Sequence, residues 1–173
     1  MKKIKTPLDK AQIRGLKAGD EVLLSGVIYT ARDQAHLRMA KALGASRKLP
    51  LDLKGAVIYY CGPNPAPEGK VIGSCGPTTS RRMDEFTPLL LKRGLTGMIG
   101  KGDRSPEVVS AIKKFTGIYF AAYAGCGALI AEYVLDKKLA GYKDLGPEAI
   151  YELTVKDMPL IVAIDSKGKN IYV

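Results

Sequence analysis

Branched apolar residues recur in short runs along the chain, and each run is followed by a polar or glycine-rich stretch. Residues 21–31 (EVLLSGVIYTA) are typical of a strand, because they are rich in β-branched and aromatic side chains. Residues 32–44 (RDQAHLRMAKALG) predict a helix that begins near Asp33 and ends at Gly44. A second strand is predicted over residues 55–63 (GAVIYYCGP), and it runs into a proline-rich loop.

The middle of the chain continues this alternation of strands and helices. Residues 70–76 (KVIGSCG) predict a short third strand. Residues 79–94 predict a helix that Pro88 should kink, because proline cannot donate the backbone hydrogen bond. Residues 95–103 (LTGMIGKGD) predict another short strand with a glycine-rich exit.

The clearest helix start in the chain follows this strand. Ser105 is a favoured N-cap, Pro106 suits the first helical position, and Glu107 suits the first turn. A helix is therefore predicted over residues 105–117, and a strand after it over residues 118–125 (IYFAAYAG).

In the carboxy-terminal part, the regular alternation of strands and helices ends. Residues 126–135 predict a short helix, and residues 149–173 predict two or three strands, the last pair joined by a Ser-Lys-Gly-Lys turn. Alternating strands and helices with an antiparallel tail imply an α/β layered domain with a mixed sheet. No internal repeat or linker divides the chain, so we expect a single domain over residues 1–173.

Composition narrows the class of protein. Of the 173 residues, 46% are hydrophobic and 25% are charged, which is the profile of a soluble globular protein. No run of about 18 apolar residues predicts a membrane span. The start, MKKIKTPLDK, has basic residues but no apolar segment behind them, so we expect no secretory signal and a cytoplasmic protein.

The charge balance favours an anionic partner. The formal net charge is +10, with 27 lysines and arginines against 17 aspartates and glutamates. The basic residues are spread along the chain, tryptophan is absent, and the nine tyrosines do not alternate with arginine. General nucleic-acid binding is therefore disfavoured.

The cysteines and the single histidine limit the possible metal sites. Cys61, Cys75 and Cys126 could in principle hold an iron–sulfur cluster, but they are far apart in the sequence and form no C-x-x-C pair. Each ends an apolar run, which favours buried thiols that pack as small hydrophobic groups. His36 is the only histidine, so a histidine-rich metal site is excluded.

Three predicted strands end in polar loops with candidate binding residues. The helix start in GPTTSRRMD combines hydroxyls, free backbone N–H groups and two arginines, which would bind a phosphate or a carboxylate. In open α/β sheets, ligands bind where strands end and helices begin. We therefore expect these loops to bring together Arg32, Thr78, Arg82 and Lys101.

Six motifs occur in one order: TPL near the start, LSGVIYTARDQAH, YYCGP, GPTTSRRMD, MIGKGD and AGCGA. Together they resemble the β subunit of two-subunit, iron–sulfur-dependent class I fumarate hydratases and the matching C-terminal domain of the single-chain forms. The related L-tartrate dehydratase β subunit shares the pattern. The resemblance covers nearly the whole chain and implies a swivelling β/β/α domain that pairs with an α subunit, in an assembly of two α and two β chains.

The resemblance also implies a reaction and a cofactor. The enzymes of this family add water reversibly to fumarate to give (S)-malate, and their α subunit supplies three cysteines to a 4Fe–4S cluster. It follows that Cys61, Cys75 and Cys126 are not cluster ligands, and that this chain is a hydro-lyase subunit active only with its α partner. L-tartrate dehydratase, which gives oxaloacetate, and a non-catalytic anion- or nucleic-acid-binding module are the alternatives.

Four residues take direct roles by this resemblance. Thr78 matches the family threonine proposed to remove the C3 proton, and a nearby cation or relay must lower the pKa of its hydroxyl. Lys101 matches a lysine close to the substrate carboxylate, which is a candidate for that cation. Arg32 and Arg82 match arginines that bind the substrate carboxylates.

Three neighbouring residues are assigned lesser roles. Asp33 and His36 lie in the same motif as Arg32 and are expected to support the site. Arg81 replaces a residue that is small in the family, often glycine, so we expect its side chain to face solvent.

Overall fold

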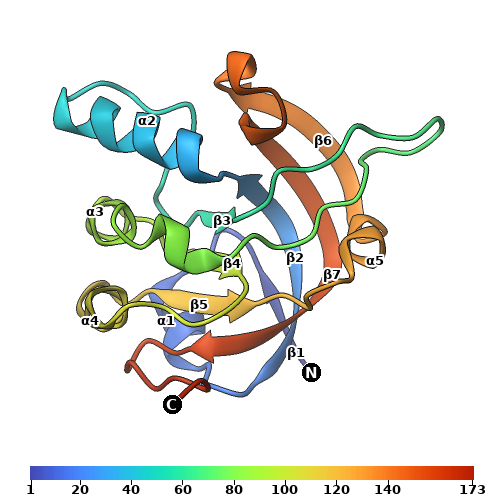
Figure 1. The fold of residues 1–173 in the computed structure, drawn as a ribbon. Helices are drawn as coiled ribbons and strands as arrows, with labels where there is room; N and C mark the ends of the chain where they lie inside the picture. Colours follow the sequence, from blue (N-terminus) through green and yellow to red (C-terminus); the bar gives the residue numbers. More distant parts are fainter.

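In the computed structural model, which describes every residue of the chain, four parallel strands form the centre of the sheet (Figure 1). They are β2 (Glu21–Thr30), β3 (Val57–Tyr59), β4 (Gly97–Gly100) and β5 (Ile118–Ala121), paired in this order. The long strand β7 (Ile150–Ile164) pairs antiparallel with both β5 and β2. Because β7 joins the two outer members of the parallel set, these strands close into a barrel-like sheet.

Two further strands extend the sheet beyond the barrel. β1 (Lys2–Lys5) pairs parallel with the first half of β2, and β6 (Val134–Gly141) pairs antiparallel with the first half of β7. The strand order is β1-β2-β3-β4-β5-β7-β6, so β6 is an edge strand. The short helix α1 (Lys10–Arg14) follows β1 and begins at Asp9, whose carboxylate accepts the Gln12 N–H at 2.7 Å.

Three helices cover the outer face of the parallel strands (Figure 1). They are α2 (Asp33–Gly44), α3 (Thr87–Lys92) and α4 (Pro106–Phe115). The start of α4 is as predicted, because the Ser105 hydroxyl accepts the Val108 N–H at 3.3 Å. No helix of the chain has the length and apolar character needed to span a membrane.

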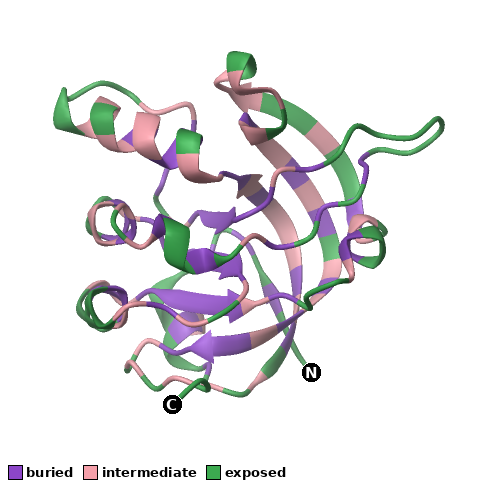
Figure 2. Cartoon of the chain, viewed as in Figure 1, coloured by how far each residue is buried: buried purple, intermediate pink, exposed green.

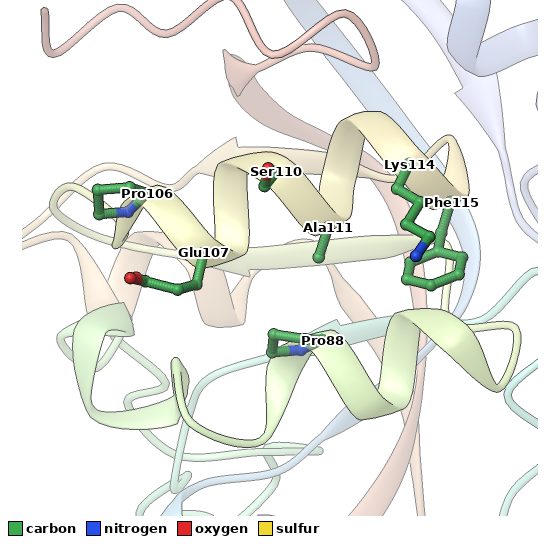
Figure 3. Close-up of a pocket in the computed structure, with 7 residues that line it drawn as sticks. All are labelled: Pro88, Pro106, Glu107, Ser110, Ala111, Lys114 and Phe115. Atoms are coloured by element: carbon green, nitrogen blue, oxygen red, sulfur yellow. The ribbon is translucent and has the colours of Figure 1, made fainter.

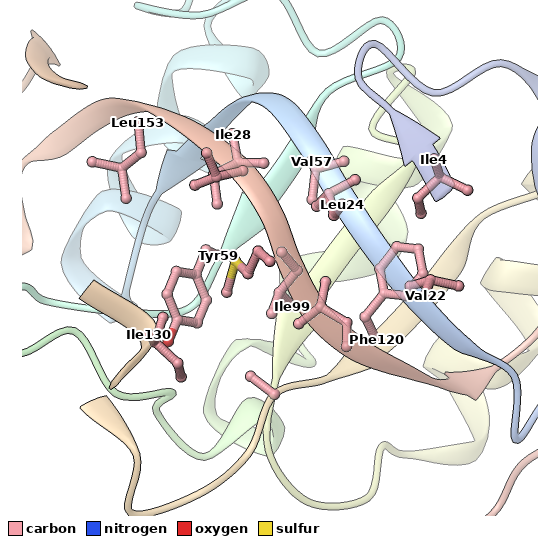
Figure 4. Packing of buried hydrophobic residues seen from close by; sticks show 14 of the residues in the cluster. Ile4, Val22, Leu24, Ile28, Val57, Tyr59, Ile99, Phe120, Ile130 and Leu153 are labelled. Carbon is pink, nitrogen blue, oxygen red and sulfur yellow. The ribbon is translucent and has the colours of Figure 1, made fainter. Parts of the chain in front are cut away.

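Alternate residues of the short parallel strands belong to two different hydrophobic cores. Tyr59 and Ile99 pack inside the barrel in a cluster of 23 buried residues (Figure 4), whereas Ile58 and Met98 pack beneath the helices in a cluster of 20. This division follows because successive side chains of a strand point to opposite faces. Figure 2 shows β3, β4 and β5 largely buried, whereas β6 and the outer faces of the helices are largely exposed or half-buried. The layers are therefore two of sheet and one of helices, which confirms the predicted β/β/α arrangement with a mixed sheet.

The predicted third strand, over residues 70–76, is wrong. This segment is the returning part of a loop, in which the Asn64 N–H donates to the Ser74 carbonyl at 2.9 Å. The Cys75 N–H donates to the Gly127 carbonyl at 3.1 Å. These contacts occupy the backbone groups that a sheet ladder would need, although the apolar composition resembles that of a strand.

Two predicted helices are shorter than expected. The segment 79–94 contains a 3-10 helix, η1 (Ser80–Met83), and then α3, with Pro88 in the first turn of α3 rather than at a kink. The segment 126–135 contains only α5 (Gly127–Ala131), because the chain turns into β6 three residues later. The polar residues of β6 do not show the alternation by which strands are usually recognised.

The carboxy-terminal segment contains one long strand where two or three were expected. A second 3-10 helix, η2 (Lys143–Glu148), leads into β7, which accounts for most of residues 149–173. After β7 the chain turns back, and Ile164 and Asn170 form only an isolated bridge. The predicted turn is therefore present, but the strand after it is not.

Candidate active site

The carboxyl ends of β3 and β4 hold the segment that carries Thr78. The Thr78 N–H donates to the carbonyl of Tyr60, directly after β3, at 2.7 Å. The Ser80 N–H donates to the carbonyl of Lys101, directly after β4, at 3.0 Å, and Thr79 pairs with Lys101 in a parallel bridge. Thr78 and Lys101, both half-buried, therefore lie on neighbouring segments at one edge of the sheet.

Gly100 allows this close approach. A Cβ atom at Gly100 would clash with the hydroxyl oxygen of Ser80. That hydroxyl is hydrogen-bonded to the Tyr119 hydroxyl at 2.8 Å, which itself donates to the Gly102 carbonyl at 2.8 Å. The two loops of the candidate site are thus joined through a buried tyrosine of β5.

Asp33 lies between the two candidate arginines. Arg82 Nε donates to Asp33 Oδ1 at 2.8 Å, which joins η1 to the first turn of α2. Arg32 Nε lies 3.8 Å from both Asp33 Oδ2 and Glu148 Oε1, which is too far for a hydrogen bond. Arg32 Nε and Asp33 Oδ2 are consequently buried without hydrogen-bond partners. Such atoms are costly to leave unsatisfied, so Arg32 Nε is well suited to an incoming acceptor.

The two candidate arginines also differ in how far their side chains are exposed. The Arg32 side chain is 27% exposed and the Arg82 side chain is 54% exposed. Arg32 lies against the start of the loop after β3, because a Cβ at Gly62 would be 3.1 Å from Arg32 Cδ. Arg81 is exposed, as expected, and makes no ion pair.

His36 is fully buried beneath the start of α2. Its Nδ1 lies 2.8 Å from the Arg32 carbonyl, which can only accept, so Nδ1 carries the proton. Its ring meets the Tyr60 ring edge to face, with centroids 5.3 Å apart. Burial lowers the pKa of His36 to about 4, so the ring is neutral at pH 7. The histidine therefore supports the backbone of Arg32 and carries no charge of its own.

The structure adds Arg104, which the motif analysis did not single out. Its side chain is fully buried, and its Nε donates to Asp84 Oδ1 at 2.6 Å. Its Nη2 donates to Thr87 Oγ1 at 2.8 Å. The guanidinium carbon also lies 5.2 Å from the Tyr60 ring centroid and 4.9 Å from that of Tyr119. Arg104 is therefore an almost fully satisfied buried cation directly after the GKGD motif.

This buried cation connects the segments that carry the candidate residues. Asp84 follows η1, which carries Arg82, and Arg104 belongs to the loop that begins with Lys101. Asp84 Oδ2 also accepts the Ser105 N–H at 2.6 Å, at the start of α4. One signal in the sequence could have pointed to this residue: an arginine stands between a glycine-rich strand exit and a helix N-cap.

The cysteines do not form a metal site. Cys61 and Cys75 are buried in the core, as predicted for thiols that pack as small apolar groups, whereas Cys126 is only half-buried. Cys61 and Cys75 are nevertheless neighbours in space, and a hydrogen bond with Cys75 together with burial raises the pKa of Cys61. No group of three or more histidine, cysteine or acidic side chains could hold a metal ion. The residues of this chain therefore do not fit an iron–sulfur cluster.

The five principal cavities of the chain lie away from the four candidate residues. The largest of the five principal ones, about 570 Å³, lies between α3 and α4 and is lined mainly by Pro88, Pro106 and neighbouring residues of α4 (Figure 3). It contains no cluster of reactive side chains. None of the five is lined by the four candidate residues Arg32, Thr78, Arg82 and Lys101. Arg32, Thr78 and Lys101 are half-buried and Arg82 is exposed, so this chain alone presents the candidate site at its surface.

Comparison with known proteins places this geometry in a family. Residues 2–173 match the family described as Fumarase C-terminus. The chain belongs to this family. It is 41% identical over 171 residues to a Methanocaldococcus jannaschii protein provisionally named L(+)-tartrate dehydratase subunit beta, covering 95% of this chain and 88% of that protein.

The fumarase C-terminus also occurs within much longer relatives. Identity is 35% to fumarate hydratase 2 of Leishmania major over 98% of this chain, and 35% to the anaerobic class I fumarate hydratase of Escherichia coli over 94%. The chain spans only 30% of the length of each of these proteins. Hence the homologues of this fumarase C-terminus chain are hydro-lyases, and the part that matches is their carboxy-terminal region or a separate β subunit.

Proposed function

We propose that this chain is the β subunit of a two-subunit class I fumarate hydratase, which reversibly hydrates fumarate to (S)-malate. The observation that carries the proposal is a cluster of cationic side chains at one edge of the sheet. There Asp33 holds Arg82 beside Arg32, and the segments that carry Thr78 and Lys101 are joined by a backbone bridge. Membership of a family whose homologues are hydro-lyases gives this cationic edge a substrate class, the four-carbon dicarboxylates.

Arg32 and Arg82 bind the substrate carboxylates. A guanidinium donates two parallel hydrogen bonds to a carboxylate, and Arg32 Nε has no hydrogen-bond partner within the chain. Asp33 orients Arg82 through Nε and leaves its two terminal nitrogens free of it. The two arginines therefore hold the dicarboxylate in one orientation.

Thr78 removes the proton from C3 of malate and returns it in the hydration direction. This proton is weakly acidic, and its removal places negative charge on the adjacent carboxylate. Fixed cations near that carboxylate stabilise the developing charge, which is the role of Lys101 and Arg82. Lys101 is on the segment that pairs with the neighbour of Thr78, which supports a second role for it in favouring the deprotonated hydroxyl.

The partner is an α subunit that holds a 4Fe–4S cluster, and the assembly contains two copies of each chain. The cluster, when bound, supplies a Lewis acid for the hydroxyl group that leaves malate. This chain has no group of three or more histidine, cysteine or acidic side chains that could hold a metal ion, which supports assigning the cluster ligands to the partner. The length of the single-chain relatives, of which this chain covers 30%, supports this division.

The runner-up is the β subunit of L-tartrate dehydratase, which gives oxaloacetate. It is favoured by one observation: the M. jannaschii relative that this chain covers almost completely carries that name. Both substrates are four-carbon dicarboxylates, so the same arginines would bind either.

Turnover by the assembled enzyme decides between these functions. The chain is produced with the α subunit of the same organism under anaerobic conditions, and hydration of fumarate and dehydration of L-tartrate are measured side by side. We expect fumarate to have the higher kcat/KM, and preference for L-tartrate selects the runner-up. Turnover of neither dicarboxylate, combined with salt-dependent binding of DNA or RNA, would reject both and favour a non-catalytic nucleic-acid-binding module.

A further inference from the structure

The exposed apolar residues of the chain are unevenly distributed. Nine large hydrophobic side chains are exposed, and four of them lie at the chain termini: Met1, Ile171, Tyr172 and Val173. All of the others lie on the loop 62–76, on the segment between β5 and α5, on α5 itself or on β6: Val71, Tyr123, Leu129, Leu135 and Leu139. Single exposed apolar residues are ordinary, whereas a group on adjoining segments indicates an interaction surface.

Contacts join these segments into one surface. The Cys75 N–H donates to the Gly127 carbonyl at 3.1 Å, and Lys70 forms an ion pair with Glu132 at 3.2 Å. A shallow cavity of about 140 Å³ lies between them, lined by Val71 together with residues of α5 and the start of β6. Figure 1 shows the loop, α5 and β6 on the side of the molecule away from α2, α3 and α4.

This surface borders the candidate site. The loop 62–76 begins at Gly62, which touches the Arg32 side chain, and it ends two residues before Thr78. On the other side, the Ala122 N–H donates to the Gly100 carbonyl at 2.9 Å, directly beside Lys101 and one residue before Tyr123. A partner that covered the apolar surface would therefore reach the open edge of the site.

We propose that Val71, Tyr123, Leu129 and Leu135, here called the apolar rim, form the centre of the interface with the α subunit. The single-chain relatives contain more than twice the length of this chain in addition to the part that matches it, so a large partner must pack against the domain. Leu129 and Leu135 are 56% and 55% exposed, and they lie on segments that adjoin those of Val71 and Tyr123, so the four form a group rather than single exposed residues. The rim carries an apolar centre with Lys70 and Glu132 beside it, as protein interfaces commonly do.

A catalytic reason supports the same partner. The four candidate residues line none of the principal cavities, and removal of a weakly acidic proton requires a site from which bulk water is excluded. An α subunit that lies on the apolar rim and extends over Thr78 would enclose the substrate and, at the same time, bring the ligands of the proposed cluster to the site. This inference rests on the two-subunit arrangement of the proposed function, but it concerns a surface and not the reaction.

The test compares charged substitutions on and off the rim. Leu129→Glu and Leu135→Glu are each titrated against the α subunit of the same organism, and Ile171→Glu is the matched control. Ile171 is 43% exposed and stands two residues before the carboxyl terminus, which Figure 1 marks on the side of the molecule away from α5 and β6. Because a buried charge at the centre of an interface is costly, we expect each rim variant to raise Kd at least about tenfold and the control to leave it unchanged. The melting temperatures of the isolated chains should agree, since all three side chains are exposed.

Each outcome bears on a distinct claim. Wild-type affinity in both rim variants overturns the rim as the interface and leaves the proposed function standing. A wild-type complex that forms but turns over neither dicarboxylate overturns the proposed function and leaves the rim standing. No complex with the wild-type chain overturns the rim. Sedimentation of the rim variants tests a further outcome. If the variants lose self-association but keep α-subunit binding, the surface belongs to a second copy of this chain and the inference is overturned.

Discussion

Replacing Arg104 with methionine removes a charge that the folded protein buries completely. Arg104 Nε lies 2.6 Å from Asp84 Oδ1, and the two side chains are 0% and 10% exposed. Without the guanidinium, the Asp84 carboxylate stays buried with no cation, which costs about 3–5 kcal/mol. The hydrogen bond to Thr87 Oγ1 is lost as well. We therefore expect Arg104→Met to lower the free energy of unfolding by about 4 kcal/mol, a large part of the about 5–15 kcal/mol typical of a domain.

Urea unfolding followed by circular dichroism measures this loss. With a slope of about 2 kcal/mol per molar urea, a loss of about 4 kcal/mol moves the midpoint by about 2 M. Lys138→Met is the control, because it breaks an ion pair with Asp136, 3.3 Å long, whose side chains are 68% and 52% exposed. An exposed pair contributes at most about 1 kcal/mol, so the control should barely move the midpoint.

Two further variants separate the ion pair from packing. Arg104→Lys keeps the charge but loses the planar fork and the stacking on two tyrosines, so its stability should lie between wild type and Arg104→Met. Arg104→Met combined with Asp84→Asn should lose less than the sum of the single losses, because the double variant no longer buries an unpaired charge. The reasoning would be refuted if Arg104→Met and Lys138→Met lowered the free energy of unfolding equally, or if the loss in the double variant equalled the sum of the two single losses.

The remaining predictions concern the candidate site and its pH dependence. Thr78→Ala in the assembled enzyme should lower kcat about a hundredfold or more with little change in KM, since a positioned base contributes about that much, while Thr79→Ala should stay near wild type. Arg82→Ala should raise KM and lower kcat, because the proposed role of Arg82 is to bind both substrate and transition state, whereas Arg81→Ala should change neither much. His36 is the only histidine, and its pKa falls from 6.5 in the unfolded chain to about 4 on folding. The unfolded chain therefore binds the extra proton between these values, and stability should fall by about 3 kcal/mol as the pH falls from 6.5 to 4. His36→Asn, which cannot titrate, should remove that part of the pH dependence in urea unfolding, and an unchanged profile would contradict it.

Local signals explain which parts of the fold could be predicted from the sequence. The Ser-Pro-Glu start of α4 was found because an N-cap and a proline at the first position act within one turn. The sequence does not predict β6, because its side chains face mostly solvent and show little apolar alternation, so only its pairing with β7 makes it a strand. The strand prediction for residues 70–76 is wrong for the opposite reason. The apolar residues of this segment pack in the core, but the segment that carries them is a loop.

The same distinction holds for the candidate site. Arg32, Thr78, Arg82 and Lys101 stand in short motifs at strand exits, so their placement at one edge of the sheet could be expected from the alternation of strands and helices. Their catalytic and binding roles stay predictions. The Asp33–Arg82 pair and the burial of Arg104 depend on contacts between residues 49 and 20 positions apart, which no local pattern specifies.

The buried network and the open surface explain together why one chain would present these residues without enclosing them. Below the site, Arg104 joins the segment of Arg82 to the loop of Lys101, so their backbones are positioned before any partner binds. Above it, Arg82 is more than half exposed, and a carboxylate bound there alone keeps much of its hydration. Charge–charge attraction in water is weak and becomes strong only when the surroundings exclude solvent. If the proposed α subunit covers the site, assembly changes the dielectric environment of side chains that are already in place. On the proposed function, the strength of dicarboxylate binding should therefore follow the formation of the complex rather than the folding of this chain.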